Sequence, residues 1–222
     1  MKRELVIAAY DKPLDWVSQV NKDVKITVYR KGEVMPLGEN EIKLEPNVGR
    51  CVHSFFTHMY NNYDNLADYT FFVQDFPFDH WGNLIEIING SDEDISNKAT
   101  LKFDGYYGYH NNTMGTAWSL PISYQFGNGN ALQCFSDGFP QDRNPNINVN
   151  KYWDLLIAYP VAPPAVYEFM PGGHFVITRE QIHKNTKEQY KKILELLEND
   201  VTAPWMIERL ECYIFSYKYR LK

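Results

Sequence analysis

Short apolar runs along the chain predict three β-strands, each closed by polar or turn-forming residues. Residues 4–10 are mostly apolar and run into Asp-Lys-Pro, which is typical of a strand buried on both faces. Residues 24–29 alternate between apolar and polar positions, and residues 68–74 are rich in aromatic and β-branched side chains. A short helix beginning near Asp15 is expected between the first two strands. Strand, helix and strand at this spacing form a βαβ unit, which favours a parallel sheet.

Apolar residues at helical spacing predict helices over 51–63 and 84–88 and near the C-terminus. A capping-box pattern begins at Thr186, and Thr202-Ala-Pro opens a last helix. By contrast, residues 90–165 are rich in Gly, Asn, Pro and Tyr and lack helical periodicity. We expect long loops there, with one or two strands.

Length and composition agree with one folded domain. The 222 residues are 44% hydrophobic and 15% aromatic, which is enough to bury a large core without disulfides. We therefore predict a single α/β domain over residues 1–222, in which helices flank a central, mostly parallel (mixed) β-sheet. No apolar run reaches the roughly 20 residues that a membrane span needs.

Charge and cysteine usage narrow the functional classes. The net charge of −6 disfavours a nucleic-acid partner, whose phosphates require clustered cations. Three widely spaced cysteines without a CxxC pair indicate neither a disulfide framework nor a cysteine zinc site, so we expect a reducing compartment, the cytoplasm. The sequence also lacks the signatures of P-loop NTPases, dinucleotide-binding folds, GxSxG hydrolases and HExxH metalloproteases.

Two carboxylates and an imidazole follow directly on the third predicted strand, at Asp75, Asp79 and His80. In open α/β sheets, ligands bind at the carboxyl ends of the strands. Carboxylate oxygens suit Mg²⁺ or Mn²⁺, and a nearby imidazole favours Mn²⁺. A metal held there would clamp a diphosphate and neutralise it as a leaving group. The same residues also suit a polar turn in which aspartates cap a helix, and the spacing leaves both interpretations open.

A second candidate is an anion site at the start of the helix predicted over 51–63. Asn47-x-Gly-Arg50 places backbone N–H groups and an arginine at a helix N-terminus. Tyr10 and Asp11 end the first strand, where the tyrosine ring could stack on a base. An ordinary helix start and an aromatic residue at a sheet edge explain the same residues without a ligand.

Two further residues are candidates to act on a bound ligand. His174 follows a Gly172-Gly173 pair, which indicates close approach of the backbone to a ligand or to another element. Glu208, on the last predicted helix, is a candidate general base if it lies near a substrate. A structural histidine and an exposed glutamate paired with Arg209 are the alternative interpretations.

Several stretches of the chain, taken in order, resemble glycosyltransferases of the GT-A type, in which a nucleotide-binding βαβ half and an acidic metal motif precede an acceptor half. They are similar in particular to a family found in bacteria, fungi and large algal viruses. That family includes the N-terminal glycosyltransferase domain of a chlorovirus protein that builds capsid glycans. The stretches lie between about residue 4 and about residue 215 and include Asn47-Val48-Gly49-Arg50, Tyr63-Asp64-Asn65-Leu66, residues 70–80 and Trp205-Met206-Ile207-Glu208-Arg209.

The resemblance implies a UDP-sugar donor, Mn²⁺ (or Mg²⁺) as cofactor, and a glycan or glycoprotein acceptor. It divides the chain into a nucleotide-binding half over about 1–90 and an acceptor half over about 91–222. The nucleotide-sugar-binding residues would be Tyr10, Asp11, Arg30, Asn47, Arg50, Gln74 and Asp75. The metal ligands would be Asp75, Asp79 and His80, and catalysis would fall to Glu208 as base and to His174. The acids lie four residues apart instead of forming the compact Asp-x-Asp usual in GT-A enzymes, which leaves open which acid holds the metal.

The leading hypothesis is therefore a metal-dependent glycosyltransferase, acting in viral glycoprotein synthesis in the host cytoplasm if the chain is viral. Aromatic residues would offer flat faces to sugar rings, although core packing explains them equally. They are Tyr106, Tyr107, Tyr109, Trp118, Tyr124 and Trp153. A non-catalytic carbohydrate-binding module would use these rings alone. A metal-dependent phosphoester hydrolase would use the same acids to release phosphate.

Overall fold

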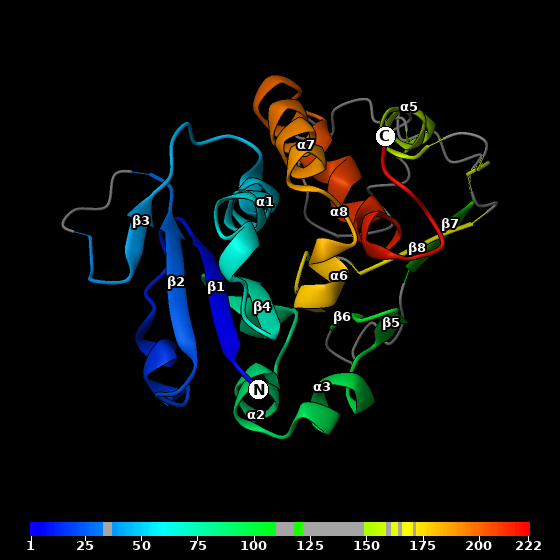
Figure 1. Ribbon diagram of the computed structural model, residues 1–222. Helices are drawn as coiled ribbons and strands as arrows, with labels where there is room; N and C mark the ends of the chain where they lie inside the picture. Colours follow the sequence, from blue (N-terminus) through cyan, green and yellow to red (C-terminus); the bar gives the residue numbers. More distant parts are fainter. Residues whose placement is uncertain (33–36, 110–117, 122–148, 159–160, 164–165, 171) are drawn as a thin grey trace.

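A seven-stranded mixed sheet forms the centre of the computed structural model, which describes residues 1–32, 37–109, 118–121, 149–158, 161–163, 166–170 and 172–222 (Figure 1). Its strands are β1 (Arg3–Ala9), β2 (Lys25–Arg30), β3 (Glu41–Lys43), β4 (Tyr69–Gln74), β5 (Leu101–Phe103), β6 (Tyr106–Gly108) and β9 (Phe175–Thr178). They lie in the order β3-β2-β1-β4-β9-β6-β5. A second, two-stranded sheet pairs β7 (Trp118–Pro121) with β8 (Val166–Phe169) in antiparallel orientation.

Helices and 3₁₀ turns pack on the sheet. The α-helices are α1 (Arg50–Asn61), α2 (Leu84–Asn89), α3 (Asp92–Asn97), α5 (Val149–Leu156), α6 (Arg179–His183), α7 (Lys187–Asn199) and α8 (Ala203–Phe215). The 3₁₀ turns are η1 (Asp15–Gln19), η2 (Tyr63–Asn65) and η3 (Pro77–Asp79). Within the described parts of the chain, none of the helices is both long enough and apolar enough to cross a bilayer.

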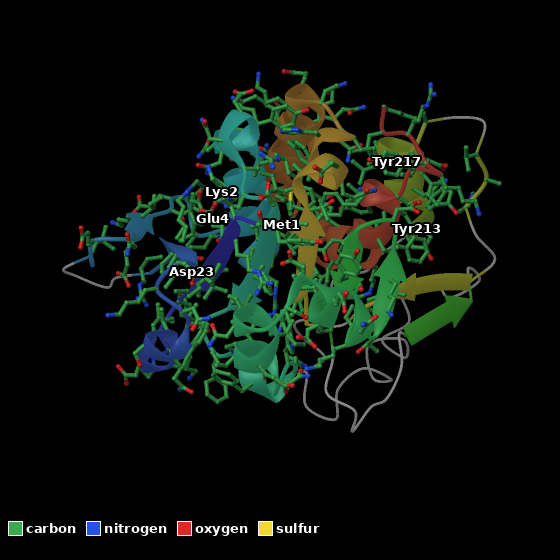
Figure 2. All side chains as sticks on the ribbon, turned by 60° about the horizontal axis from the view of Figure 1, so that its bottom comes forward. Met1, Lys2, Glu4, Asp23, Tyr213 and Tyr217 are labelled. Carbon is green, nitrogen blue, oxygen red and sulfur yellow. The ribbon has the colours of Figure 1, made fainter. Side chains whose placement is uncertain are left out.

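The central strand β1 is apolar along its length because both of its faces are covered. Val6 packs into the core that contains α1, α7 and α8, whereas Leu5 and Ile7 pack into the core that contains η1, α2 and α3. Figure 2 shows the side chains that fill the space around the sheet. Glu4 is the polar exception: it is buried, and its Oε1 accepts a hydrogen bond from Oγ1 of Thr27 at 2.8 Å.

The order of the parallel strands creates a crevice at one edge of the sheet. β1 pairs in parallel with β2 on one side and with β4 on the other. The chain adds β2 and β3 on the first side, returns through α1, and then adds β4 on the opposite side. Beyond β4, the strands β9, β6 and β5 are antiparallel. Ligands of open α/β sheets bind outside the carboxyl ends of the strands at such a change of direction, which here lies between β1 and β4.

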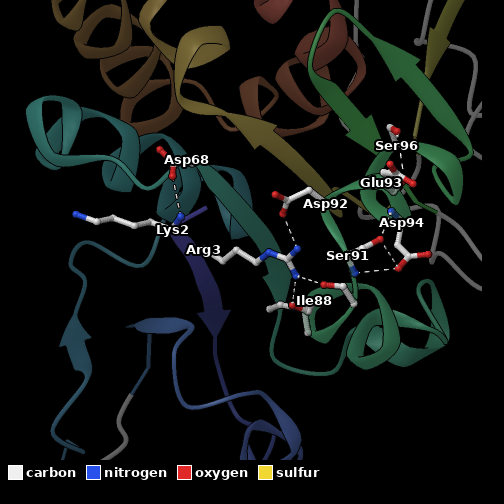
Figure 3. A network of polar contacts seen from close by, with 10 residues as sticks. Lys2, Arg3, Asp68, Ile88, Ser91, Asp92, Glu93, Asp94 and Ser96 are labelled. Atoms are coloured by element: carbon white, nitrogen blue, oxygen red, sulfur yellow. Dashed lines mark hydrogen bonds and ion pairs between the residues drawn. The ribbon is translucent and has the colours of Figure 1, made fainter.

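The amino end of β1 is tied down on the opposite side of the molecule from this crevice. Arg3 donates from Nη1 to the carbonyl oxygens of Ile88 at 2.7 Å and Gly90 at 2.8 Å (Figure 3). Its Nη2 donates to Asp92 at 2.6 Å, and Ser91 caps α3 in a capping box. These contacts anchor the turn between α2 and α3 to the sheet.

The structure confirms the predicted α/β class and the single mixed sheet, and differs from the predictions in shorter elements. The short helix predicted near Asp15 is confirmed as the 3₁₀ helix η1, Asp15–Gln19. The segment 90–165, predicted as loops with one or two strands, contains the three strands β5, β6 and β7 and the helices α3 and α5 in its described parts. Helix α3 has only six residues and buries one of them, Ile95, so it carries no apolar periodicity that the sequence could display.

Candidate functional site

A cavity of about 290 Å³ lies at the carboxyl ends of β1 and β4, against the first turns of α1. It is lined by Ala8, Ala9, Tyr10, Lys31, Asn47, Arg50, Cys51, Ser54, Gln74 and Asp75. Five of the seven residues predicted to bind a nucleotide sugar are among them, namely Tyr10, Asn47, Arg50, Gln74 and Asp75. A larger hollow of about 820 Å³ near the amino end of β2 is lined by none of the predicted site residues. The strand-end cavity is therefore the candidate site.

Asp75 shapes the mouth of this cavity. Its Oδ2 accepts hydrogen bonds from the backbone N–H groups of Tyr10 at 2.9 Å and Lys12 at 3.1 Å, so it holds the loop that leaves β1. The Tyr10 ring is 55% exposed and lies over Gly32, where a Cβ would approach the ring to 3.1 Å. The glycine thus lets an exposed aromatic face stand at the cavity entrance.

Arg50 begins α1 in a conformation that is unusual for a residue with a side chain. Its φ is +54°, in the left-handed region, and the preceding Gly49 is also left-handed. The guanidinium carbon lies 4.2 Å from the centroid of the Trp205 ring, a cation–π contact with α8. Strained backbone of this kind costs about 1–3 kcal/mol and is concentrated at ligand-binding sites. The helix start therefore presents a fixed cation at the cavity.

Lys31 is a site residue that the sequence analysis missed. It is buried, and its Nζ donates to the carbonyl oxygens of Val48 and, at 2.8 Å, of Arg50. Burial lowers the pKa of Lys31 from 10.5 to about 8. The sequence analysis chose the neighbouring Arg30, but that side chain forms an ion pair with Glu41 and is not part of the cavity lining. Adjacent residues of a strand point to opposite faces, and only the sheet shows which face meets the cavity.

The lowered pKa of Lys31 gives a test of whether this lysine binds anions. The charged fraction of its ammonium falls from about nine-tenths at pH 7 to about one-tenth at pH 9, so we expect affinity for an anionic probe, inorganic pyrophosphate, to fall about tenfold over that interval. Calorimetric titration at several pH values measures this. Lys31→Met should bind more weakly at pH 7 and show no such dependence, and a wild-type affinity that stays constant up to pH 9 would contradict the assignment.

The lowered pKa of Lys31 also affects stability: the free energy of unfolding rises at high pH, where the affinity for anions is expected to fall. Between pH 8 and pH 10.5 the unfolded chain binds a proton at Lys31 that the folded chain has released. The contribution of this residue to the free energy of unfolding therefore rises with pH across that window.

A glycine turn connects the cavity to the predicted base. Nε2 of Gln74 donates to the carbonyl oxygen of Gly172 at 2.8 Å, and the N–H of Gly172 donates to Oε1 of Glu208 at 2.9 Å. Gly172 has a φ of +93°, and a Cβ there would lie 3.0 Å from the ring of His80. A Cβ on Gly173 would lie 3.7 Å from Sγ of Cys51 and 4.0 Å from Cγ of Glu208. Gly172 thus lies between Glu208 on one side and Gln74, a residue of the cavity lining, on the other.

Burial raises the pKa of two groups near Glu208, whereas Arg209 places a cation beside it, with Nη1 of Arg209 3.9 Å from Oε2 of Glu208. Burial and the charge of Glu208 raise the pKa of the Cys51 thiol to about 12. Burial raises the pKa of Glu211 well above its ordinary value, and the Tyr106 hydroxyl donates to it at 3.3 Å. Of these two acids on α8, Glu211 is fully buried, whereas the Glu208 side chain is 16% exposed. Glu208 is therefore the more accessible of the two acids, and it lies outside the cavity lining.

Asp11, Asp79 and His174, which were also predicted as site residues, lie outside the cavity lining. Asp11 is exposed beside Lys12 and outside the cavity lining. Asp79 is exposed, with Oδ2 3.7 Å from Nε2 of His80. His174 is fully buried, and its ring packs edge-to-face on His80 with centroids 5.6 Å apart. His174 is therefore packed against His80 inside the protein and outside the cavity lining, and its catalytic role stays a prediction.

The described residues offer fewer metal ligands and fewer accessible aromatic rings than predicted. Among the residues that the structure describes, no group of three or more His, Cys, Asp or Glu side chains is placed to hold a metal ion. Tyr106, Tyr109 and Trp153 are buried in the core, so they offer no faces to sugars, and Tyr107 is half-buried. The Trp118 side chain and the whole of Tyr124 lie outside the described residues. Core packing is thus the correct interpretation for three of these rings.

Fold and cavity together define an α/β protein with a ligand crevice where the strand order changes direction. The chain belongs to the family described as Protein of unknown function (DUF3431), whose family model matches residues 5–221. That range includes both the cavity and the glycine turn at Gly172. No curated protein and no solved structure matches the chain.

Proposed function

We propose that this protein is a glycosyltransferase that binds a nucleotide sugar, UDP-linked, in the strand-end cavity and transfers the sugar to a hydroxyl of a glycan or glycoprotein. The observation that carries the proposal is the convergence of Tyr10, Asn47, Arg50, Gln74 and Asp75 on one cavity. These residues come from three separate stretches of the chain. The GT-A resemblance supports the same assignment.

The charges around the cavity suit a diphosphate. Arg50 presents a guanidinium, Lys31 an ammonium, and α1 the N-terminal end of a twelve-residue helix. Cations and N–H groups fixed in this way stabilise the negative charge that grows on a departing nucleoside diphosphate. Tyr10 offers an exposed ring at the entrance, suited to stacking on a base or a sugar.

Glu208 is the proposed base for the acceptor hydroxyl. Its Oε1 is held by the N–H of Gly172, so the carboxylate has a fixed orientation. The link from Gln74 through Gly172 couples that orientation to the cavity. In an inverting reaction, the acceptor oxygen forms a bond to the anomeric carbon, the bond to the diphosphate breaks, and the acceptor proton passes to the carboxylate.

A divalent cation fits the site only together with a substrate. Oδ1 of Asp75 has no hydrogen bond within the described residues, and Asp79 is exposed nearby in the sequence, so carboxylate oxygens suited to Mn²⁺ or Mg²⁺ are present. Such ions are commonly held by one or two carboxylates together with substrate phosphates. When bound, the ion would neutralise charge on the diphosphate. We therefore expect Mn²⁺ alone to bind weakly and Mn²⁺ to bind more tightly once UDP is present.

Calorimetric titration of UDP, with GDP and CMP as controls, tests the proposal. We expect UDP to bind preferentially, Mn²⁺ to increase its affinity at least about tenfold, and Asp79→Ala to remove that increase. Asp79 is exposed, so its replacement should not disturb the fold. If no nucleotide binds in either condition, the transferase loses its donor. Sugar binding without nucleotide or metal would instead favour a carbohydrate-binding module.

We further propose that the reaction takes place in the cytoplasm, that of the host if the chain is viral, where it would serve glycan synthesis on capsid glycoproteins. Cys51 is a free thiol, and the three cysteines of the sequence include no CxxC pair, which supports a reducing compartment. The resemblance to a family that includes capsid-glycan enzymes supports the viral setting.

A further inference from the structure

The floor of the cavity contains a buried hydroxyl whose bonding capacity is unused. Ser54 lines the cavity from α1, is 0% exposed, and its Oγ makes no hydrogen bond with any residue that the structure describes. A buried hydroxyl without a partner is unfavourable, and in native proteins such groups are uncommon. The Ser54 hydroxyl therefore calls for a partner that the described residues do not provide.

The neighbouring helix residues show why Ser54 lacks a partner. A serine or threonine inside a helix usually donates to the carbonyl oxygen four residues earlier, as Thr57 does to His53 at 2.7 Å. The corresponding carbonyl for Ser54 is that of Arg50, which accepts the Lys31 ammonium at 2.8 Å. The backbone of Arg50 is moreover in the left-handed region, so the first turn departs from regular helix geometry. The lysine thus occupies the position that the serine would use.

The same arrangement leaves a second donor at this end of the cavity. An ammonium carries three N–H donors, and those of Lys31 bond to the carbonyl oxygens of Val48 and Arg50 within the described residues. The remaining donor and the Ser54 hydroxyl both belong to the cavity lining, beside the small side chains of Ala8 and Ala9. Two donors in one cavity lining suit an oxygen acceptor of a ligand.

We propose that Ser54 Oγ and Lys31 Nζ together bind an acceptor oxygen of the nucleotide, which makes Ser54 a specificity-determining residue of the site. This inference rests on the proposed function. The acceptor is a carbonyl oxygen of the base or an oxygen of the diphosphate, because both present lone pairs to paired donors. Uridine contains only the first kind of acceptor and pyrophosphate only the second, so the two compounds distinguish them.

The test is the variant Ser54→Ala, for which we expect the protein to keep its stability but to bind UDP more weakly. The thermal midpoint of the ligand-free variant should stay the same or rise, because an unbonded buried hydroxyl has been removed. Its dissociation constant for UDP should rise about tenfold, the loss expected for one good hydrogen bond. The same increase with uridine identifies the base as the acceptor, and with pyrophosphate it identifies the phosphate. Thr57→Val, which removes a hydroxyl already bonded within the helix, should leave all three affinities unchanged.

Two outcomes would overturn this inference alone. One is a variant that binds UDP, uridine and pyrophosphate as the wild type does. The other is a clear fall in the thermal midpoint, which would show that the hydroxyl has a partner within the fold. A wild-type protein that binds none of the three compounds would overturn the proposed function as well, so the two failures are distinguishable.

Discussion

Arg50→Ala is expected to weaken UDP binding by about 100-fold while leaving the protein folded. The guanidinium lines the cavity and is fixed against the Trp205 ring, so it is pre-oriented for a bidentate contact with phosphate. Two charge-assisted hydrogen bonds of about 1.5 kcal/mol each correspond to a change of this size. Calorimetric titration with UDP measures it directly.

Three further variants sharpen the test of Arg50. Arg50→Lys keeps the charge but loses the planar fork, and we expect an intermediate loss of about tenfold. Arg50→Gly should bind UDP as poorly as Arg50→Ala does. Its free energy of unfolding should be about 1 kcal/mol higher than that of Arg50→Ala, because glycine adopts the left-handed φ of this position without strain. Arg179→Ala removes an arginine paired with Asp68 away from the cavity and serves as the control. Unchanged affinity in Arg50→Ala would rule out this arginine as the phosphate ligand.

Glu208→Gln is expected to reduce sugar transfer about 1,000-fold, within the range that general-base catalysis contributes. The glutamine oxygen can still accept the Gly172 N–H, so the turn and the affinity for UDP should be preserved. What the variant lacks is a carboxylate able to take the acceptor proton. The measurement is release of UDP from UDP-sugars in the presence of sugar acceptors, with UDP affinity determined alongside.

Glu211→Gln is the matched control for Glu208. The two acids lie three residues apart on α8, but burial raises the pKa of Glu211 well above its ordinary value, so we expect this acid to be protonated and glutamine there to change no charge. We expect transfer by Glu211→Gln to remain within about threefold of the wild type, since a neutral acid is replaced by a neutral amide. Full transfer activity in Glu208→Gln would exclude it as the base. A loss of UDP affinity in that variant would instead indicate that Glu208 positions the Gly172 turn.

The sequence predicted those site residues that lie next to a recognisable strand or helix pattern, and it did not predict contacts between residues far apart in the chain. Tyr10, Gln74 and Asp75 follow apolar runs, and Arg50 follows a helix-start pattern. Because parallel strands end at the same edge of a sheet, such residues could be expected to meet there. The link from Gln74 through Gly172 to Glu208 joins residues separated by 98 and 36 positions, and no local pattern contains it.

By itself, the sequence determined the apolar strand β1, the capping box of α7 and the α/β class, since burial on both faces, capping and helical periodicity are properties of neighbouring residues. Only the tertiary structure decided that Lys31, and not Arg30, faces the cavity, because strand residues alternate and the face is set by pairing with β1. It likewise decided that the Ser54 hydroxyl has no hydrogen-bond partner within the part of the chain that the structure describes. That hydroxyl is left unbonded because a lysine from another strand occupies the Arg50 carbonyl, and such competition between distant groups arises only when the chain has folded.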